Sequence, residues 1–147
     1  MKIALKYGLL ITLCFIAWVV VAHLLVPDPH SRVHDIGAGI FVNIVEVLAI
    51  FLGIKARRLE NAQLTFKEGL KTGVGIAFVY GLSSCLFFIA EMLVLGPKIL
   101  AGHPGAETQP IWQVVLGAFL GLFGGALLFG LLYSTIISFV FAVRQRS

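Results

Sequence analysis

Residues 36–54, IGAGIFVNIVEVLAIFLGI, form an apolar run of membrane-spanning length with one carboxylic acid, Glu46, near its middle. At a rise of 1.5 Å per helical residue, Glu46 lies about 15 Å from the outer end of this helix, close to the midplane of a hydrocarbon core. The face of this helix that carries Glu46 must turn toward protein or water rather than lipid, because an ionisable group at this depth is costly. The residues that share this face at helical spacing are Gly39, Asn43, Glu46, Ile50 and Gly53.

Composition supports a membrane location. Hydrophobic residues make up 59% of the 147 residues and charged residues 12%, which is about half the charged share of a soluble domain. We therefore expect one integral membrane domain over residues 1–147, surrounded by the lipid bilayer, with no room for a separate catalytic domain. The net charge of +4 comes from cations at the ends of the apolar segments, so we expect no nucleic-acid binding.

Four apolar segments predict an all-α membrane protein with four transmembrane helices. These helices are expected over residues 3–26, 36–54, 66–96 and 111–143. Asp35 is expected to cap the second helix at its N-terminus. Thr65 and Glu68 have the spacing of a capping box at the start of the third helix. The charged stretch that begins at Lys55 is expected to follow the second helix on the cytoplasmic side.

Lysine and arginine predict the orientation of these helices. Only Arg32 and Lys98 fall on one side of the membrane, and the other nine cations fall on the opposite side. The positive-inside rule therefore predicts that the N- and C-termini are both cytoplasmic. The nine cations are Lys2, Lys6, Lys55, Arg57, Arg58, Lys67, Lys71, Arg144 and Arg146.

Small residues recur at four-residue steps along the third and fourth helices. Such ridges allow helix backbones to approach closely where no hydrophobic force draws them together. The pattern leaves open whether the ridges of the fourth helix face this chain or a second copy. On the third helix the ridge is Gly69, Gly73, Ala77 and Gly81; on the fourth it is Gly117, Gly121 and Gly125, followed by Gly130, Ser134 and Ser138.

Two further polar residues complete a candidate intramembrane polar site with Glu46 and Asn43. Glu91 lies about 7 Å from the outer end of the third helix, where water can reach it, so a structural or interfacial role is favoured. His23 lies about one turn from the outer end of the first helix, where a histidine is more often an interfacial group than a ligand.

The sequence contains no pattern that predicts catalysis. It has no glycine-rich phosphate loop, no Ser-His-Asp order, no paired-cysteine metal motif and no His-Glu-x-x-His motif. His30 and His34 have a ligand-like spacing, but the neighbouring prolines favour a solvated turn over a zinc site. Cys14 and Cys85 lie in apolar helices and are expected to be packing residues. We therefore expect no enzyme, no cofactor and no bound metal.

Two tracts, LGIKARR over residues 52–58 and LTFKEGLKTG over residues 64–73, carry a family resemblance. They resemble the small bacterial membrane proteins of the family catalogued as domain of unknown function 4199. The opening IALKYG over residues 3–8 and the glycine-rich last helix are also similar to that family. The resemblance implies a four-helix, multi-pass protein of the bacterial cytoplasmic (inner) membrane, and it implies no activity.

Two functional hypotheses fit these features. The first is a non-catalytic accessory or scaffold subunit that packs against other membrane helices, in a homo-oligomer or a larger membrane complex. The alternative is a small transporter in which Glu46, with Asn43 and Glu91, holds a proton or cation in a polar cavity. The sequence leaves a structural and a functional Glu46 equally open. A structural Glu46 is expected to be uncharged, because a hydrogen bond worth about 0.6 kcal/mol does not offset a charge costing about 2.5–3.5 kcal/mol.

Overall fold

The structure is a computed structural model that describes residues 1–25, 32–60, 64–95 and 110–143. Within these ranges it describes all side chains except those of residues 23, 32–36, 95 and 111. Every regular element in the described ranges is helical, and four helical stretches are long and apolar enough to cross a membrane. The predicted all-α fold with four transmembrane helices is therefore confirmed. The elements are α1 (Lys2–Leu25), α2 (Arg32–Glu60), α3 (Phe66–Leu95), α4 (Ile111–Phe119), η2 (Leu120–Gly124) and α5 (Gly125–Val143).

The second helix is longer at both ends than its apolar run. It begins at Arg32, so the prediction that Asp35 caps this helix is wrong: Asp35 lies inside the first turn. It also continues past residue 54 to Glu60, where the prediction placed a charged segment after the helix. The extension is rich in good helix formers, and an ion pair of 2.9 Å joins Arg57 and Glu60 one turn apart. Basic residues in the last turn also complement the helix dipole.

The fourth span is not one regular α-helix. A π-helical turn, η2, separates α4 from α5. Gly121, Gly124 and Gly125 fall in or beside this turn, and glycine weakens an α-helix because it leaves the backbone free to adopt other conformations. The predicted helix over residues 111–143 is thus present as a span but interrupted near its middle.

The capping box at the start of α3 is confirmed. The Thr65 amide donates to Glu68 Oε2 at 3.0 Å, and the Glu68 amide donates to Thr65 Oγ1 at 3.3 Å. Each side chain therefore satisfies a backbone donor that the first turn leaves without a helical partner.

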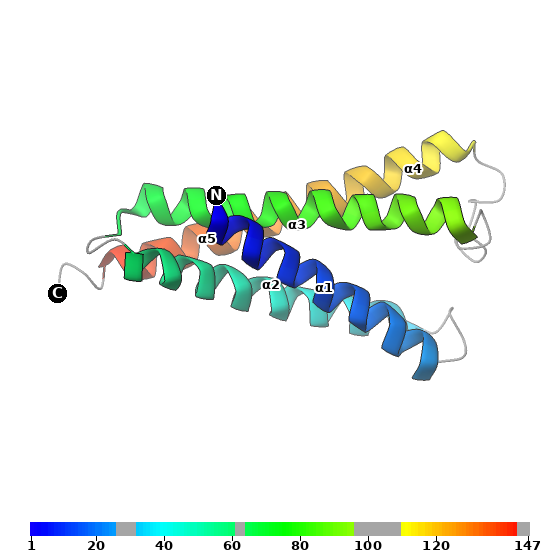
Figure 1. Ribbon diagram of the computed structural model, residues 1–147, viewed down its shortest axis with the longest axis horizontal. Helices are drawn as coiled ribbons and strands as arrows, with labels where there is room; N and C mark the ends of the chain where they lie inside the picture. Colours follow the sequence, from blue (N-terminus) through cyan, green and yellow to red (C-terminus); the bar gives the residue numbers. More distant parts are fainter. Residues whose placement is uncertain (26–31, 61–63, 96–109, 144–147) are drawn as a thin grey trace.

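The helices run side by side, and we call the end where α1 begins, α2 ends, α3 begins and α5 ends the basic end (Figure 1). Toward the opposite end, α1 and α2 diverge from α3 and α4 (Figure 1). Aromatic rings join α1 to α2 and α3 to the fourth span. Trp18 of α1 stacks on Phe41 of α2 at 4.7 Å between ring centroids. Phe78 of α3 meets Phe123 of η2 edge to face at 5.5 Å.

The apolar core fills the half of the bundle nearest the basic end. It draws on α1, α2, α3 and α5, together with Leu64 just before α3. Glu46 lies one turn from Ile50 along α2, beside this core. The core residues are Ile11, Ala49, Ile50, Ile54, Leu64, Ile76, Tyr80, Ala126 and Phe141.

Candidate intramembrane polar site

Glu46 is directed into the bundle. Only 3% of the residue is exposed, and the next turns of the same face of α2, at Ile50 and Ile54, are fully buried. At the other end of this face Gly39 is exposed, and a Cβ atom built on it would meet no described residue within 4 Å. The face that Glu46 shares with these residues is therefore buried from Glu46 toward the basic end and open in the opposite direction.

The Glu46 carboxyl lies beside the closest approach of α3 and α5. A Cβ atom built on Gly130 of α5 would sit 3.2 Å from Glu46 Oε1 and would overlap the side chain of Ala77 on α3. Glu46 Oε1 is buried and has no hydrogen-bond partner among the described residues. A buried polar atom without a partner costs about 1–3 kcal/mol. Three helices thus enclose Glu46, and its Oε1 atom has no hydrogen bond to the described residues that would compensate for its burial.

Asn43, one turn from Glu46 along α2, links α2 to α5. Its amide donates to the Gly39 backbone oxygen at 2.7 Å, and its side-chain oxygen accepts from the Tyr133 hydroxyl at 2.6 Å. Both partners of Asn43 are therefore protein groups, one in its own helix and one in α5. The structure brings Asn43 and Glu46 together on adjacent turns of one face.

Sequence reasoning missed two tyrosines near Glu46. Tyr80 of α3 is buried, and both Tyr80 and Tyr133 lie close enough to Glu46 to interact with it electrostatically. A signal for them was present, because a tyrosine within an apolar membrane helix needs a polar partner for its hydroxyl group. The polar site of the bundle therefore comprises Glu46, Asn43, Tyr80 and Tyr133.

Glu91, which the sequence placed in the same site, does not join this cluster. Ala77 of α3 lies at the level of the Glu46 carboxyl, and Glu91 is 14 residues further along the same helix, or about 21 Å. Glu91 is partly buried near the far end of α3. The His23 side chain lies outside the described part of the structure.

The small residues of α3 pack against those of α5 in a regular antiparallel seam. A Cβ atom built on Gly69 would sit 2.6 Å from Ser138 Oγ, and one built on Gly73 would overlap Ser134. Ala77 faces Gly130 in the same way, and a Cβ atom built on Gly81 would sit 3.2 Å from Ala126 Cβ. Each step of four along α3 thus meets a step of four in the opposite direction along α5. This α3–α5 seam holds the two helices close enough to enclose Glu46.

The other glycine ridge has no partner in the described chain. Cβ atoms built on Gly117, Gly121 and Gly125 would meet nothing within 4 Å, and the same holds for Gly124. The spacing of these residues resembles that of the α3–α5 seam, but none of the described helices covers them. Packing among the described helices therefore does not account for the ridge.

The model of the family described as "Protein of unknown function (DUF4199)" matches residues 6–102, about two thirds of the chain. The chain belongs to this family. The match that places it in DUF4199 contains α2 and α3 completely and ends before α4, so the glycine-rich last helix is not part of it. The DUF4199 description assigns no activity. No curated protein and no solved structure matches the chain.

Proposed function

We propose that the protein is a non-catalytic accessory or scaffold subunit of the bacterial cytoplasmic membrane, and that its fourth span packs against a further transmembrane helix. The observation that carries this proposal is the uncovered ridge of Gly117, Gly121 and Gly125. Six other glycines, by contrast, lie where two of the described helices pack closely against each other. Cβ atoms built on them would lie within 3.0 Å of a neighbouring side chain: Gly8, Gly53, Gly69, Gly73, Gly81 and Gly130.

The partner that we propose for this ridge is the same ridge of a second copy. Two copies inserted in the same way present identical faces to each other across a two-fold axis along the membrane normal. Glycines repeated at four-residue steps suit such a parallel pair, because they let two identical backbones approach at one crossing point. Exposed apolar side chains flank the ridge, including Leu116 and Leu120, and would be covered in the same contact.

Gly121→Leu is expected to abolish this dimer. A leucine side chain at the middle of the ridge would hold the two backbones apart, while its Cβ atom would meet nothing within 4 Å in the described part of its own chain. The mass of the detergent-solubilised protein, measured by light scattering after gel filtration, should fall from that of two copies to that of one. The matched control is Gly39→Leu, which makes the same change at an uncovered glycine of α2 and should leave the mass at two copies.

Two results would contradict the homodimer. The wild-type protein could have the mass of a single copy, or the Gly121→Leu protein could remain dimeric. Isolation of the wild-type protein with a stoichiometric different membrane protein, lost in Gly121→Leu, would keep the scaffold role and replace the second copy as the partner.

A second candidate function rests on a different observation, the enclosed Glu46 carboxyl whose Oε1 has no hydrogen-bond partner. An acid in a low-dielectric site can hold a proton and exchange it for a cation. Tyr80 and Tyr133 lie near this carboxyl and could bind the cation through their rings or hydroxyl oxygens. We propose this proton- or cation-coupled transport as the alternative activity.

Glu46→Gln is expected to abolish proton-coupled flux in proteoliposomes if this alternative holds. Glutamine keeps the size and hydrogen-bonding capacity of the side chain but cannot release a proton. The measurement is the pH change inside vesicles after a cation gradient is imposed. Glu60→Gln is the matched control because it makes the same change at an exposed glutamate of the basic end. Equal flux in the wild type and in Glu46→Gln would rule the transport function out.

A further inference from the structure

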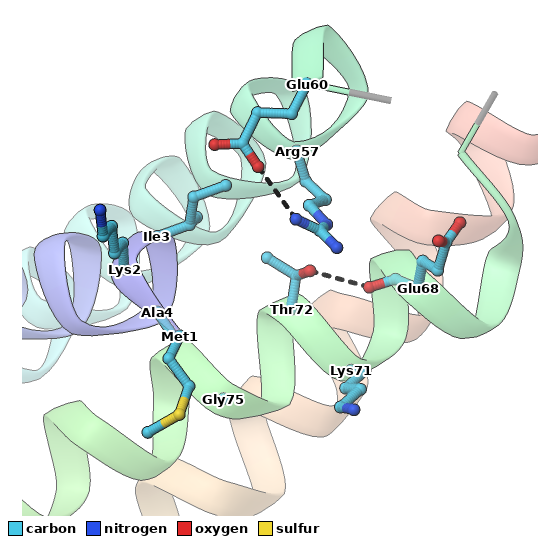
Figure 2. A pocket seen from close by; sticks show the side chains of 10 residues that line it. All are labelled: Met1, Lys2, Ile3, Ala4, Arg57, Glu60, Glu68, Lys71, Thr72 and Gly75. Carbon is cyan, nitrogen blue, oxygen red and sulfur yellow. Dashed lines mark hydrogen bonds and ion pairs between the residues drawn. The ribbon is translucent and has the colours of Figure 1, made fainter. Parts of the chain in front are cut away.

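A cavity of about 580 Å³ opens at the basic end of the bundle, where three helices meet. The first turn of α1, the last turns of α2 and the first turns of α3 line it (Figure 2). Its apolar part is formed by Ile3 and Ala4 of α1 with Gly75 of α3. A Cβ atom built on Gly75 would sit 3.3 Å from Ala4 Cβ, so these two helices close the cavity on that side.

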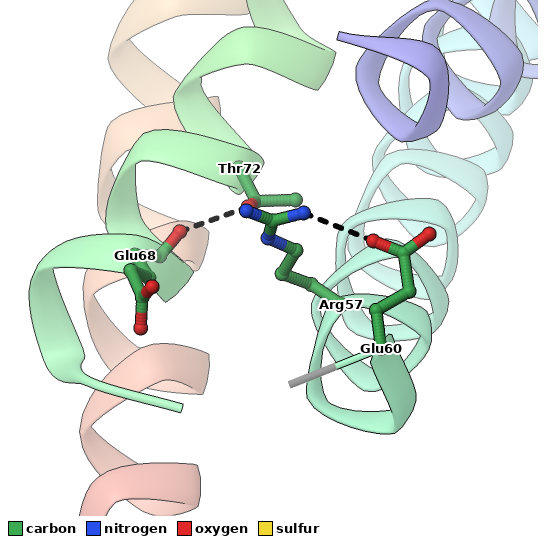
Figure 3. A network of polar contacts seen from close by, with 4 residues as sticks. All are labelled: Arg57, Glu60, Glu68 and Thr72. Atoms are coloured by element: carbon green, nitrogen blue, oxygen red, sulfur yellow. Dashed lines mark hydrogen bonds and ion pairs between the residues drawn. The ribbon is translucent and has the colours of Figure 1, made fainter. Parts of the chain in front are cut away.

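Arg57 is the charged group nearest the middle of the cavity. It reaches from α2 toward α3, and its guanidinium group lies between Glu60 and Thr72 in both close views (Figures 2 and 3). One of its N–H groups donates to Glu60 Oε2 at 2.9 Å. Since a guanidinium carries five N–H donors and Arg57 makes this one hydrogen bond in the described structure, most of its donors are available. Its side chain is 40% exposed, so a ligand can reach it from water.

The charges that line the cavity favour an anion. Lys2, Arg57 and Lys71 contribute three positive charges, against two negative charges from Glu60 and Glu68. Both carboxylates are already engaged: Glu60 with Arg57, and Glu68 with Thr65 in the capping box. Within the described ranges, by contrast, Lys2 and Lys71 form no ion pair. An incoming anion therefore finds cations in excess over free carboxylates.

We propose that this cavity binds a phosphate-bearing anion, with the phosphate group on Arg57 and the two lysines at the rim. The planar guanidinium group suits a phosphate because it can donate two parallel hydrogen bonds to it. The apolar side formed by Ala4 and Gly75 suits the carbon atoms next to the phosphate. Two sources share this chemistry, the headgroup of an anionic phospholipid and a soluble phosphate compound. The proposal is independent of the proposed function, since none of its residues belongs to the fourth span or to the Glu46 cluster.

Binding to the purified full chain tests the proposal, and native mass spectrometry can count the bound molecules. The probes are dioctanoyl phosphatidic acid, dioctanoyl phosphatidylcholine and inorganic phosphate. The wild-type protein is expected to bind phosphatidic acid in preference to phosphatidylcholine. Arg57→Gln is expected to weaken this binding about tenfold, as the loss of one charge-assisted hydrogen-bonding group predicts.

Arg58→Gln is the matched control. It removes the same charge from the next residue, whose guanidinium lies 5.6 Å from the centre of the Phe141 ring and does not line the cavity. Binding should change less than about twofold in this variant. Binding of inorganic phosphate but not of lipid, with the same dependence on Arg57, would support the site and identify a soluble ligand. Equal losses in the two variants, or no loss in either, would overturn the proposal.

Discussion

Gly130→Ala is expected to lower the free energy of unfolding of the bundle by about 1–3 kcal/mol, the usual cost of forcing one extra carbon into a packed interior. The added methyl group would overlap Ala77 and press against Glu46 Oε1. Both neighbours are buried in helices that are themselves packed, so α3 and α5 must move apart to make room. The effect should appear as a lower midpoint in denaturation of the detergent-solubilised protein by sodium dodecyl sulfate.

Gly39→Ala is the control for this prediction. It adds the same methyl group to a glycine where this group would meet no described residue within 4 Å, so only helix propensity is expected to change. Alanine is favoured over glycine inside a helix by about 1 kcal/mol, and the control should therefore be as stable as the wild type or more stable. If Gly130→Ala were also as stable as the wild type, α3 and α5 would not be as close as the α3–α5 seam requires.

Glu46→Met is expected to raise the free energy of unfolding by about 1–3 kcal/mol, because it removes a buried polar atom that has no partner. Methionine has a similar length and no hydrogen-bonding requirement, and its flexible chain can fill the space left by the carboxyl group. The same denaturation measurement gives the result. An acid that lowers stability where it stands is most simply explained by a role other than holding the fold together.

Glu46→Gln provides the comparison for this second prediction. Glutamine keeps the polar group and its unmet hydrogen bond, so it should gain less stability than methionine. Loss of stability in Glu46→Met would mean that the carboxyl has a partner that holds the helices together. Glu46 would then be structural, and the transport alternative would lose its support.

Much of the fold can be predicted from the sequence because a small number of strong constraints determine where a helix crosses a membrane. Length and hydropathy identify the four spans, and the pairing of Thr65 with Glu68 identifies the start of α3. The limits of α2 could not be found in this way. An apolar run ends where the membrane ends, whereas a helix continues as long as its residues favour it, and here it continues to Glu60.

The polar site was predictable only in part. Helical spacing places Asn43 and Glu46 on one face of α2, because both lie on the same helix. The two tyrosines come from α3 and α5, and the spacing within one helix does not tell which residues of another helix it will meet. Glu91 was grouped with Glu46 for the same reason, although α3 carries it to a different depth.

The glycine ridges also show that spacing within one helix does not identify its partner helix. The ridge at Gly73 and the one at Gly121 have the same four-residue step, yet only the first is covered in this chain. A four-residue spacing of small residues indicates that another helix can approach closely, but it does not identify that helix. The π-helical turn η2 was not predicted, since glycine permits several backbone conformations and the spacing of glycines does not show which one the chain adopts.

Three helices enclose the Glu46 carboxyl and keep it from the lipid. Labelling with dicyclohexylcarbodiimide, a lipid-soluble reagent for protonated carboxyl groups, tests this enclosure in a Leu48→Glu protein. Leu48 is exposed and lies on the opposite face of α2 at nearly the same depth, so one peptide then carries both acids. We expect rapid labelling at position 48 and little at Glu46, as read by tandem mass spectrometry. Equal labelling rates at the two positions would mean that Glu46 is open to the lipid.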